Sequence, residues 1–106
     1  MITDEKAEQA IRYLAGTDEE SAVASVEVKR LEDEIKAIEA AIILRVEGSV
    51  AIRESIARTD ASTIAARNKY YIALLNSERL YNKRRTAERI TELWRTCASN
   101  KRHGIV

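Results

Sequence analysis

The chain has 106 residues, of which 18 are basic and 17 acidic, and its net charge is +1 at neutral pH. Proline and phenylalanine are absent, and the apolar fraction of 45% leans on alanine, a strong helix former that buries little surface. No run approaches the roughly 18 apolar residues of a membrane span. The acidic start is also unlike the basic start of a signal peptide. We therefore expect one small helical domain without a membrane segment.

The residues that usually carry catalysis are scarce. His103 is the single histidine, Cys97 is the single cysteine, and neither has neighbours at metal-ligand spacing. No glycine pattern resembles a phosphate-binding loop. The sequence therefore predicts a protein that is not an enzyme and has no metal or cofactor. Because one cysteine forms no disulfide within the chain, we expect a reducing, cytoplasmic location.

The first predicted helix covers residues 4–15. Thr3 supplies a side-chain oxygen for the free amides at its start, and the acids that follow suit the positive end of the helix dipole. Gly16 is expected to end this helix in a left-handed conformation. Thr17 and Glu20 then match a capping box, which predicts that a new helix begins there.

The second predicted helix covers residues 18–47 and carries an apolar stripe with alternating steps of four and three. This 3.5-residue period is typical of a coiled-coil seam. The stripe consists of Ala24, Val28, Leu31, Ile35, Ile38 and Ile42. Ile43 and Leu44 project to either side of it, so this end needs further apolar neighbours. The first helix, the next short helix or a second subunit are the alternatives.

Gly48 and Ser49 predict a stop and a new cap, followed by a short helix over residues 50–58. A last helix is expected over residues 62–98, with Leu80 and Trp94 on its apolar path. Residues 99–106 are expected to form a flexible basic tail.

The predicted fold is all-α. Residues 18–47 pair with 62–98 as a long antiparallel, coiled-coil-like helical hairpin, and the two short helices cover its ends within a single domain of residues 1–98. Whether the break near residues 48–61 is a hinge, and whether the hairpin is closed or swapped between subunits, stay open.

The apolar residues exceed what one seam can bury, which predicts a homodimer or a higher homo-oligomer. The residues expected in the core or at this interface are Leu31, Ile35, Ile38, Ile42, Ile43, Leu44, Leu80 and Trp94.

Charge is unevenly distributed along the chain. Residues 1–47 carry 12 acidic and 6 basic residues, whereas residues 48–106 carry 12 basic and 5 acidic residues. One interpretation is that the two halves attract each other within the hairpin. The other is that the basic half contacts a polyanion.

Arginines dominate the stretch from Arg79 to Arg102, and arginine suits phosphate contacts. Glu88 and Glu92 are interleaved with them, so pairs along the helix are an equal explanation for part of this charge. The candidate nucleic-acid contacts are Arg85, Arg89, Lys101 and Arg102.

The end of the chain, Thr91-Glu92-Leu93-Trp94-Arg95-Thr96 followed by Ser99-Asn100-Lys101-Arg102, is similar to small helical proteins of tailed phages and prophages. Tyr13-Leu14-Ala15 and the break at Glu47-Gly48 extend the likeness. Such proteins are often encoded among early DNA-replication and recombination genes. The resemblance implies an accessory role in phage DNA metabolism inside a bacterial host, and identifies no reaction.

Two functions are therefore expected. One is a non-enzymatic accessory protein that contacts single- or double-stranded DNA through its basic end. The alternative is a helical adaptor that binds a phage or host protein, in assembly or inhibition, without touching nucleic acid.

Overall fold

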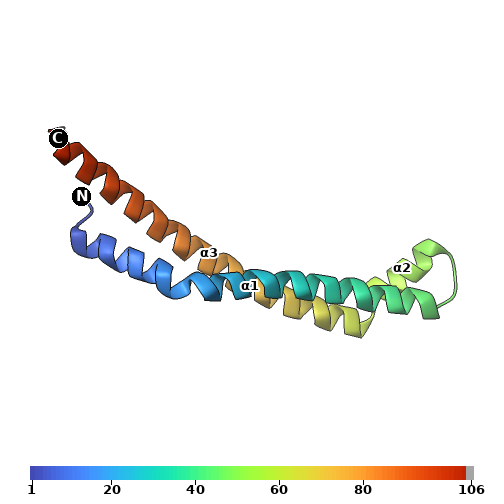
Figure 1. Cartoon of the computed structure of the whole chain (residues 1–106). Helices are drawn as coiled ribbons and strands as arrows, with labels where there is room; N and C mark the ends of the chain where they lie inside the picture. Colours follow the sequence, from blue (N-terminus) through green and yellow to red (C-terminus); the bar gives the residue numbers. More distant parts are fainter. Residues whose placement is uncertain (105–106) are drawn as a thin grey trace. The chain divides into compact units, whose positions relative to one another are not determined.

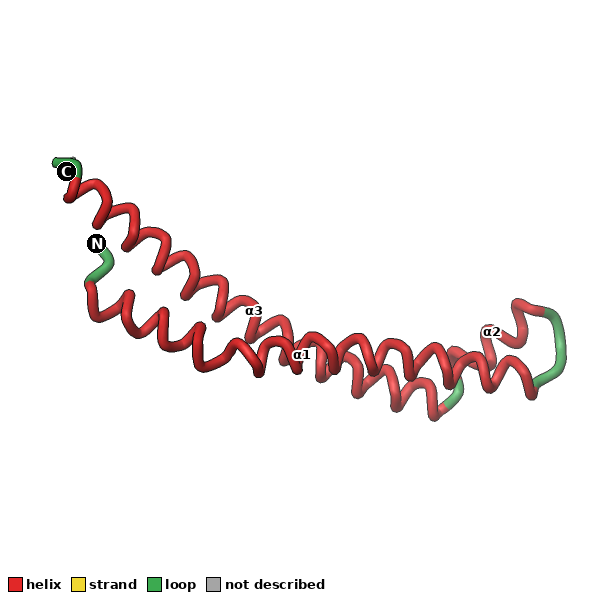
Figure 2. Tube along the Cα trace, in the orientation of Figure 1, coloured by secondary structure: helices red, strands yellow, loops and turns green. Residues whose placement is uncertain are grey.

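The computed structural model describes residues 1–104, and within them the chain forms three α-helices and no strand. α1 spans Asp4–Arg45, α2 spans Val50–Thr59 and α3 spans Ala61–Arg102 (Figure 1, Figure 2). The all-α prediction is confirmed. None of the described helices contains a stretch that is both long and apolar enough to cross a membrane.

The chain divides into two compact units, and both long helices contribute to each. The terminal unit consists of Met1–Ala22 and Glu78–Val106, and the central unit consists of Val23–Ser77. In the central unit Glu39 Oε1 lies 3.7 Å from Arg67 Nη2. In the terminal unit the start of α1 is bonded to the last third of α3. Early residues of one helix thus meet late residues of the other, which confirms the long antiparallel hairpin.

The core of the central unit follows the predicted stripe. Leu31 and Ile42 are buried, and Ile35 and Ile38 are half-buried. Beside this stripe, Ile43 is half-buried but Leu44 is 86% exposed. Nothing in the described chain therefore covers Leu44.

The terminal unit has a core of mostly small side chains. On α1 the steps of three and four continue through positions 7, 10, 14, 17 and 21, all of which are buried or half-buried. This pattern is the same heptad seam extended towards the N-terminus. The buried residues of the unit are Ala7, Ala10, Leu80, Ala87 and Thr91.

The predicted break at Gly16 is wrong, because α1 runs through it without interruption. The Thr17 hydroxyl donates to the Tyr13 carbonyl at 2.7 Å, one turn back, and does not cap a new helix. The hairpin therefore has one short accessory helix, α2, where two were expected. A continuous α1 keeps its seam against α3 on both sides of Gly16, and this packing outweighs the weak local preference of glycine for a helix end.

Replacing Gly16 with alanine tests the continuity of α1. No atom lies within 4 Å of the position where a β-carbon would be added, and Gly16 is exposed. The Gly16→Ala variant is expected to raise the free energy of unfolding by about 0.5–1 kcal/mol, the usual gain of alanine over glycine inside a helix. Urea denaturation followed by circular dichroism would measure it. A loss of stability would instead support a left-handed Gly16.

The connections around α2 agree with the predicted turn residues. Gly48 adopts a φ of 123°, a conformation that favours glycine, and the Ser49 side chain accepts a hydrogen bond from the Ile52 amide at 3.3 Å. Asp60 caps the start of α3 by accepting from the Ser62 amide at 2.9 Å. Hydrogen bonds from the Ser62 hydroxyl and amide lower the pKa of the Asp60 carboxyl.

The predicted flexible tail is partly wrong. α3 continues to Arg102, four residues beyond its expected end at residue 98, and the His103 amide donates to the Ser99 carbonyl. Lys101 and Arg102 suit this last turn because basic side chains stabilise the negative end of the helix dipole. Of the expected tail, residues 105 and 106 lie outside the described residues.

Candidate nucleic-acid interface

All four predicted nucleic-acid contacts lie on α3 in the terminal unit, and all four are exposed. Arg85 and Arg89 are one turn apart, about 6 Å along the helix axis. Lys101 and Arg102 occupy the last turn of the helix. The helix therefore presents two pairs of basic residues, separated by about three turns.

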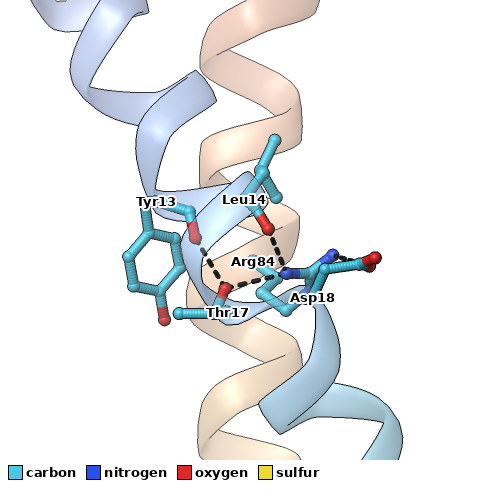
Figure 3. A network of polar contacts seen from close by, with 5 residues as sticks. All are labelled: Tyr13, Leu14, Thr17, Asp18 and Arg84. Atoms are coloured by element: carbon cyan, nitrogen blue, oxygen red, sulfur yellow. Dashed lines mark hydrogen bonds and ion pairs between the residues drawn. The ribbon is translucent and has the colours of Figure 1, made fainter.

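Arg84 belongs to the same basic stretch but points inward to α1 (Figure 3). Its Nη1 donates to the Leu14 carbonyl at 2.8 Å and to the Thr17 hydroxyl at 2.7 Å. Its Nη2 lies 3.2 Å from Asp18 Oδ1, and only 16% of the Arg84 side chain is exposed. This guanidinium is occupied within the protein and is not part of an anion-binding surface.

The signal for the inward position of Arg84 was present in the sequence. Residue 84 lies four positions after Leu80 and three before Ala87, so it occupies a seam position of the heptad pattern. A search for apolar residues at the seam positions does not find Arg84, because an arginine is unexpected there. Completing the 3.5-residue count along α3 would have placed it against α1.

Within residues 1–104, the other basic residues of this stretch have no carboxylate partner. In the described residues, Arg84 is the one member of the stretch from Arg79 to Arg102 with an ion pair within 4.0 Å. The pairs expected along α3 with Glu88 and Glu92 are not formed at this distance. The seven basic residues without such a pair are Arg79, Lys83, Arg85, Arg89, Arg95, Lys101 and Arg102.

Four of the eleven acidic residues of α1 form ion pairs within α1: Glu8, Glu27, Glu32 and Glu34. Glu8 pairs with Arg12 at 2.6 Å, and Arg30 pairs with Glu27 at 2.6 Å. The hydrogen bond from Arg30 lowers the pKa of Glu27. In the described residues two ion pairs join α1 to α3, Glu39 with Arg67 and Asp18 with Arg84. Attraction between the two halves of the chain is limited to these pairs at this distance.

A shallow hollow of about 690 Å³ runs along the face of α3 that carries Arg85 and Arg89. Glu88 and Glu92 line it as well, together with Asn82, Thr86 and Ile90. The charge of this hollow is therefore mixed. Phosphates, which arginine binds well, would contact the guanidinium groups of Arg85 and Arg89.

Trp94 is half-buried, and its indole Nε1 donates to Asp4 Oδ1 at 2.7 Å. The ring lines a hollow of about 340 Å³ together with Cys97, which is half-buried, and Lys101. This hydrogen bond joins the first residue of α1 to α3. In this position the indole serves the packing of the terminal unit rather than stacking on a base.

His103 is exposed, and its Nδ1 lies 2.8 Å from the Ser99 carbonyl oxygen. Among the described residues, no group of three or more histidine, cysteine, aspartate or glutamate side chains is placed to hold a metal ion.

No protein-family model matches this chain, and no curated protein or solved structure was found to be similar to it.

Proposed function

We propose that this protein is a non-enzymatic accessory factor in phage DNA metabolism, which contacts nucleic-acid phosphates through α3 of its terminal unit. One observation carries the proposal: seven of the eight basic residues between Arg79 and Arg102 lack an ion-pair partner in the described residues. A basic side chain without a partner is free to displace counterions from DNA. The phage context rests on the resemblance of the chain's end, and it implies the cytoplasm of a bacterial host.

Arg85 and Arg89 are the proposed central contacts, and Lys101 and Arg102, about three turns further along α3, are a second pair in its last turn. Arginine binds phosphate with paired N–H groups, and lysine binds it as a point charge. None of these contacts reads a base edge, so the proposed binding has no strong sequence preference.

The test is a fluorescence-anisotropy titration of labelled single- and double-stranded oligonucleotides at low and physiological salt. The Arg85→Ala/Arg89→Ala variant is expected to weaken binding about tenfold or more, because it removes two charge-assisted contacts. The slope of log affinity against log salt should fall by about 2. A chain truncated after Asn100 tests Lys101 and Arg102 in the same way.

The matched control is Arg45→Ala/Arg58→Ala, which removes two exposed arginines from the central unit and changes the net charge equally. It is expected to retain most of the affinity. Equal losses in both double variants would show that only net charge matters and would refute this surface. Absence of binding by the unmodified protein at physiological salt would refute the DNA role itself.

A second candidate function, a homo-oligomeric helical adaptor that binds a phage or host protein, is favoured by the exposed surface of the chain. Its accessible area is 8032 Å². A folded monomer of 12.0 kDa is expected to expose about 6,000 Å². Ten large hydrophobic side chains of the central unit are exposed. We propose that self-association covers part of this surface, and that it is compatible with either function.

A further inference from the structure

The first half of α3, in the central unit, carries large apolar side chains on its exposed side. On its other side Thr63 and Ala66 are buried. On the opposite side four large apolar residues are exposed, by between 45% and 72% of their surface. These four residues, here called the outer α3 face, are Ile64, Tyr71, Ile72 and Leu75.

The four residues of the outer α3 face are uncharged, but Ile72, at its edge, lines a hollow together with Lys69 and with Glu27, Arg30 and Glu34 of α1. Between Ala61 and Ser77 the charged residues are Arg67 and Lys69, and Arg67 is paired with Glu39 at 3.7 Å. Single exposed apolar residues are ordinary, but a contiguous group on one helix face marks a contact surface.

We propose that the outer α3 face packs against the same face of a second copy of this chain, antiparallel and about a two-fold axis. The proposal rests on the self-association suggested above and names its surface. Because Ile64, Tyr71 and Leu75 are uncharged, this part of the face requires no complementary charge in a partner, and an identical face satisfies it.

The order of residues along this face suits a two-fold axis. Ile64, Asn68, Tyr71 and Leu75 are separated by steps of four, three and four, so the spacing reads the same in both directions. An axis between positions 68 and 71 places Ile64 against Leu75 of the second copy. It also places the exposed Asn68 against Tyr71 of the second copy. A two-fold interface of this kind uses one patch twice.

Tyr71 is held in place for such a contact. The centroids of its ring and of the Tyr70 ring lie 5.6 Å apart with an interplanar angle of 53°, a favourable tilted arrangement. Tyr70 itself is half-buried. The exposed ring therefore rests on a neighbour that is already packed, which lowers the entropy lost when a second copy covers it.

Multi-angle light scattering and sedimentation over a concentration series provide the first test. The unmodified protein is expected at twice its mass of 12.0 kDa. Tyr71→Glu should raise the dimer dissociation constant about a hundredfold or more, because it buries an unpaired charge. The matched control is Tyr81→Glu, since Tyr81 is 57% exposed and Tyr71 is 55% exposed on the same helix. Circular dichroism checks that both variants fold.

A cross-linking experiment tests whether the outer α3 face is the dimer interface even where Tyr71→Glu folds poorly. In a Cys97→Ser background, Asn68→Cys is expected to form a disulfide-linked dimer under mild oxidation, because it lies next to the proposed axis. Asn82→Cys, two heptads further along the same helix and also exposed, is expected to stay monomeric on a non-reducing gel.

The outcomes separate the surface from the function. A dimer that tolerates Tyr71→Glu, with equal cross-linking at positions 68 and 82, would leave self-association standing and refute the outer α3 face. A protein that is monomeric at every concentration would refute both. Neither result depends on DNA binding, which is measured on Arg85 and Arg89 in the other unit.

Discussion

Ile42→Ala is expected to lower the free energy of unfolding by about 3 kcal/mol, within the range for removing a buried isoleucine side chain. Ile42 is 2% exposed and lies in the apolar stripe near the end of α1. Small side chains such as Ala57 and Thr63, both 0% exposed, form part of the same unit's core and cannot expand to fill the space. Urea denaturation at one fixed protein concentration would measure the loss, since any self-association adds to stability.

Leu44→Ala is the control for this prediction. Leu44 lies two residues further along α1 and is 86% exposed, so its truncation is expected to cost less than about 0.5 kcal/mol. The comparison uses the same helix end and the same type of side chain. Equal losses in the two variants would contradict the register in which α1 faces α3.

The sequence predicted the central unit well because its signal is strong there. Large apolar residues such as Leu31, Ile35 and Ile42 recur at a period of 3.5, and no other arrangement buries them together. In the terminal unit the same seam consists of small or polar residues such as Ala10 and Thr17. These residues carry little hydrophobic signal, so the continuation of the seam was not recognised.

The error at Gly16 has a related cause. Glycine followed by threonine and acidic residues has the composition of a helix break, and the local sequence does not distinguish a break from a continuous helix. What decides is the packing of α3 along α1 and the bonds of Arg84, which lies 67 residues beyond Thr17 in the chain. Contacts at this separation are not accessible to a reading of local pattern.

For the candidate site, the sequence identified the exposed basic residues but not their pairing. Arg85 and Arg89 were predicted as nucleic-acid contacts, and both are exposed. The hydrogen bond between Trp94 and Asp4 spans 90 residues and could not be derived from spacing. The choice between charge pairing and a polyanion also required side-chain positions, because both interpretations use the same residues.

Arg84→Ala is expected to lower the free energy of unfolding by about 2 kcal/mol, because it removes two charge-assisted hydrogen bonds to α1 and the packing of the arginine stem. The contact with Asp18 adds little to this value, since the Asp18 side chain is 83% exposed. Arg85→Ala is the adjacent control: Arg85 is exposed and has no ion pair, and its truncation is expected to cost less than about 0.5 kcal/mol. Equal losses would contradict the inward position of Arg84.

Arg84→Met separates the two contributions. Methionine retains a long apolar stem but cannot donate to the Leu14 carbonyl or to Thr17. Thr17 keeps its hydrogen bond to the Tyr13 carbonyl, and Leu14 lies within α1, so neither oxygen is left without a partner. Burying the guanidinium also has a cost, which methionine avoids. We therefore expect Arg84→Met to be less destabilising than Arg84→Ala by about 1 kcal/mol or more.

If Arg84→Met lowers the free energy of unfolding as much as Arg84→Ala does, the hydrogen bonds and not the stem hold α3 in register with α1. If Arg84→Met is as stable as the unmodified protein, Arg84 fixes the alignment of α3 with α1 and does not add to stability, as single polar residues do in coiled coils.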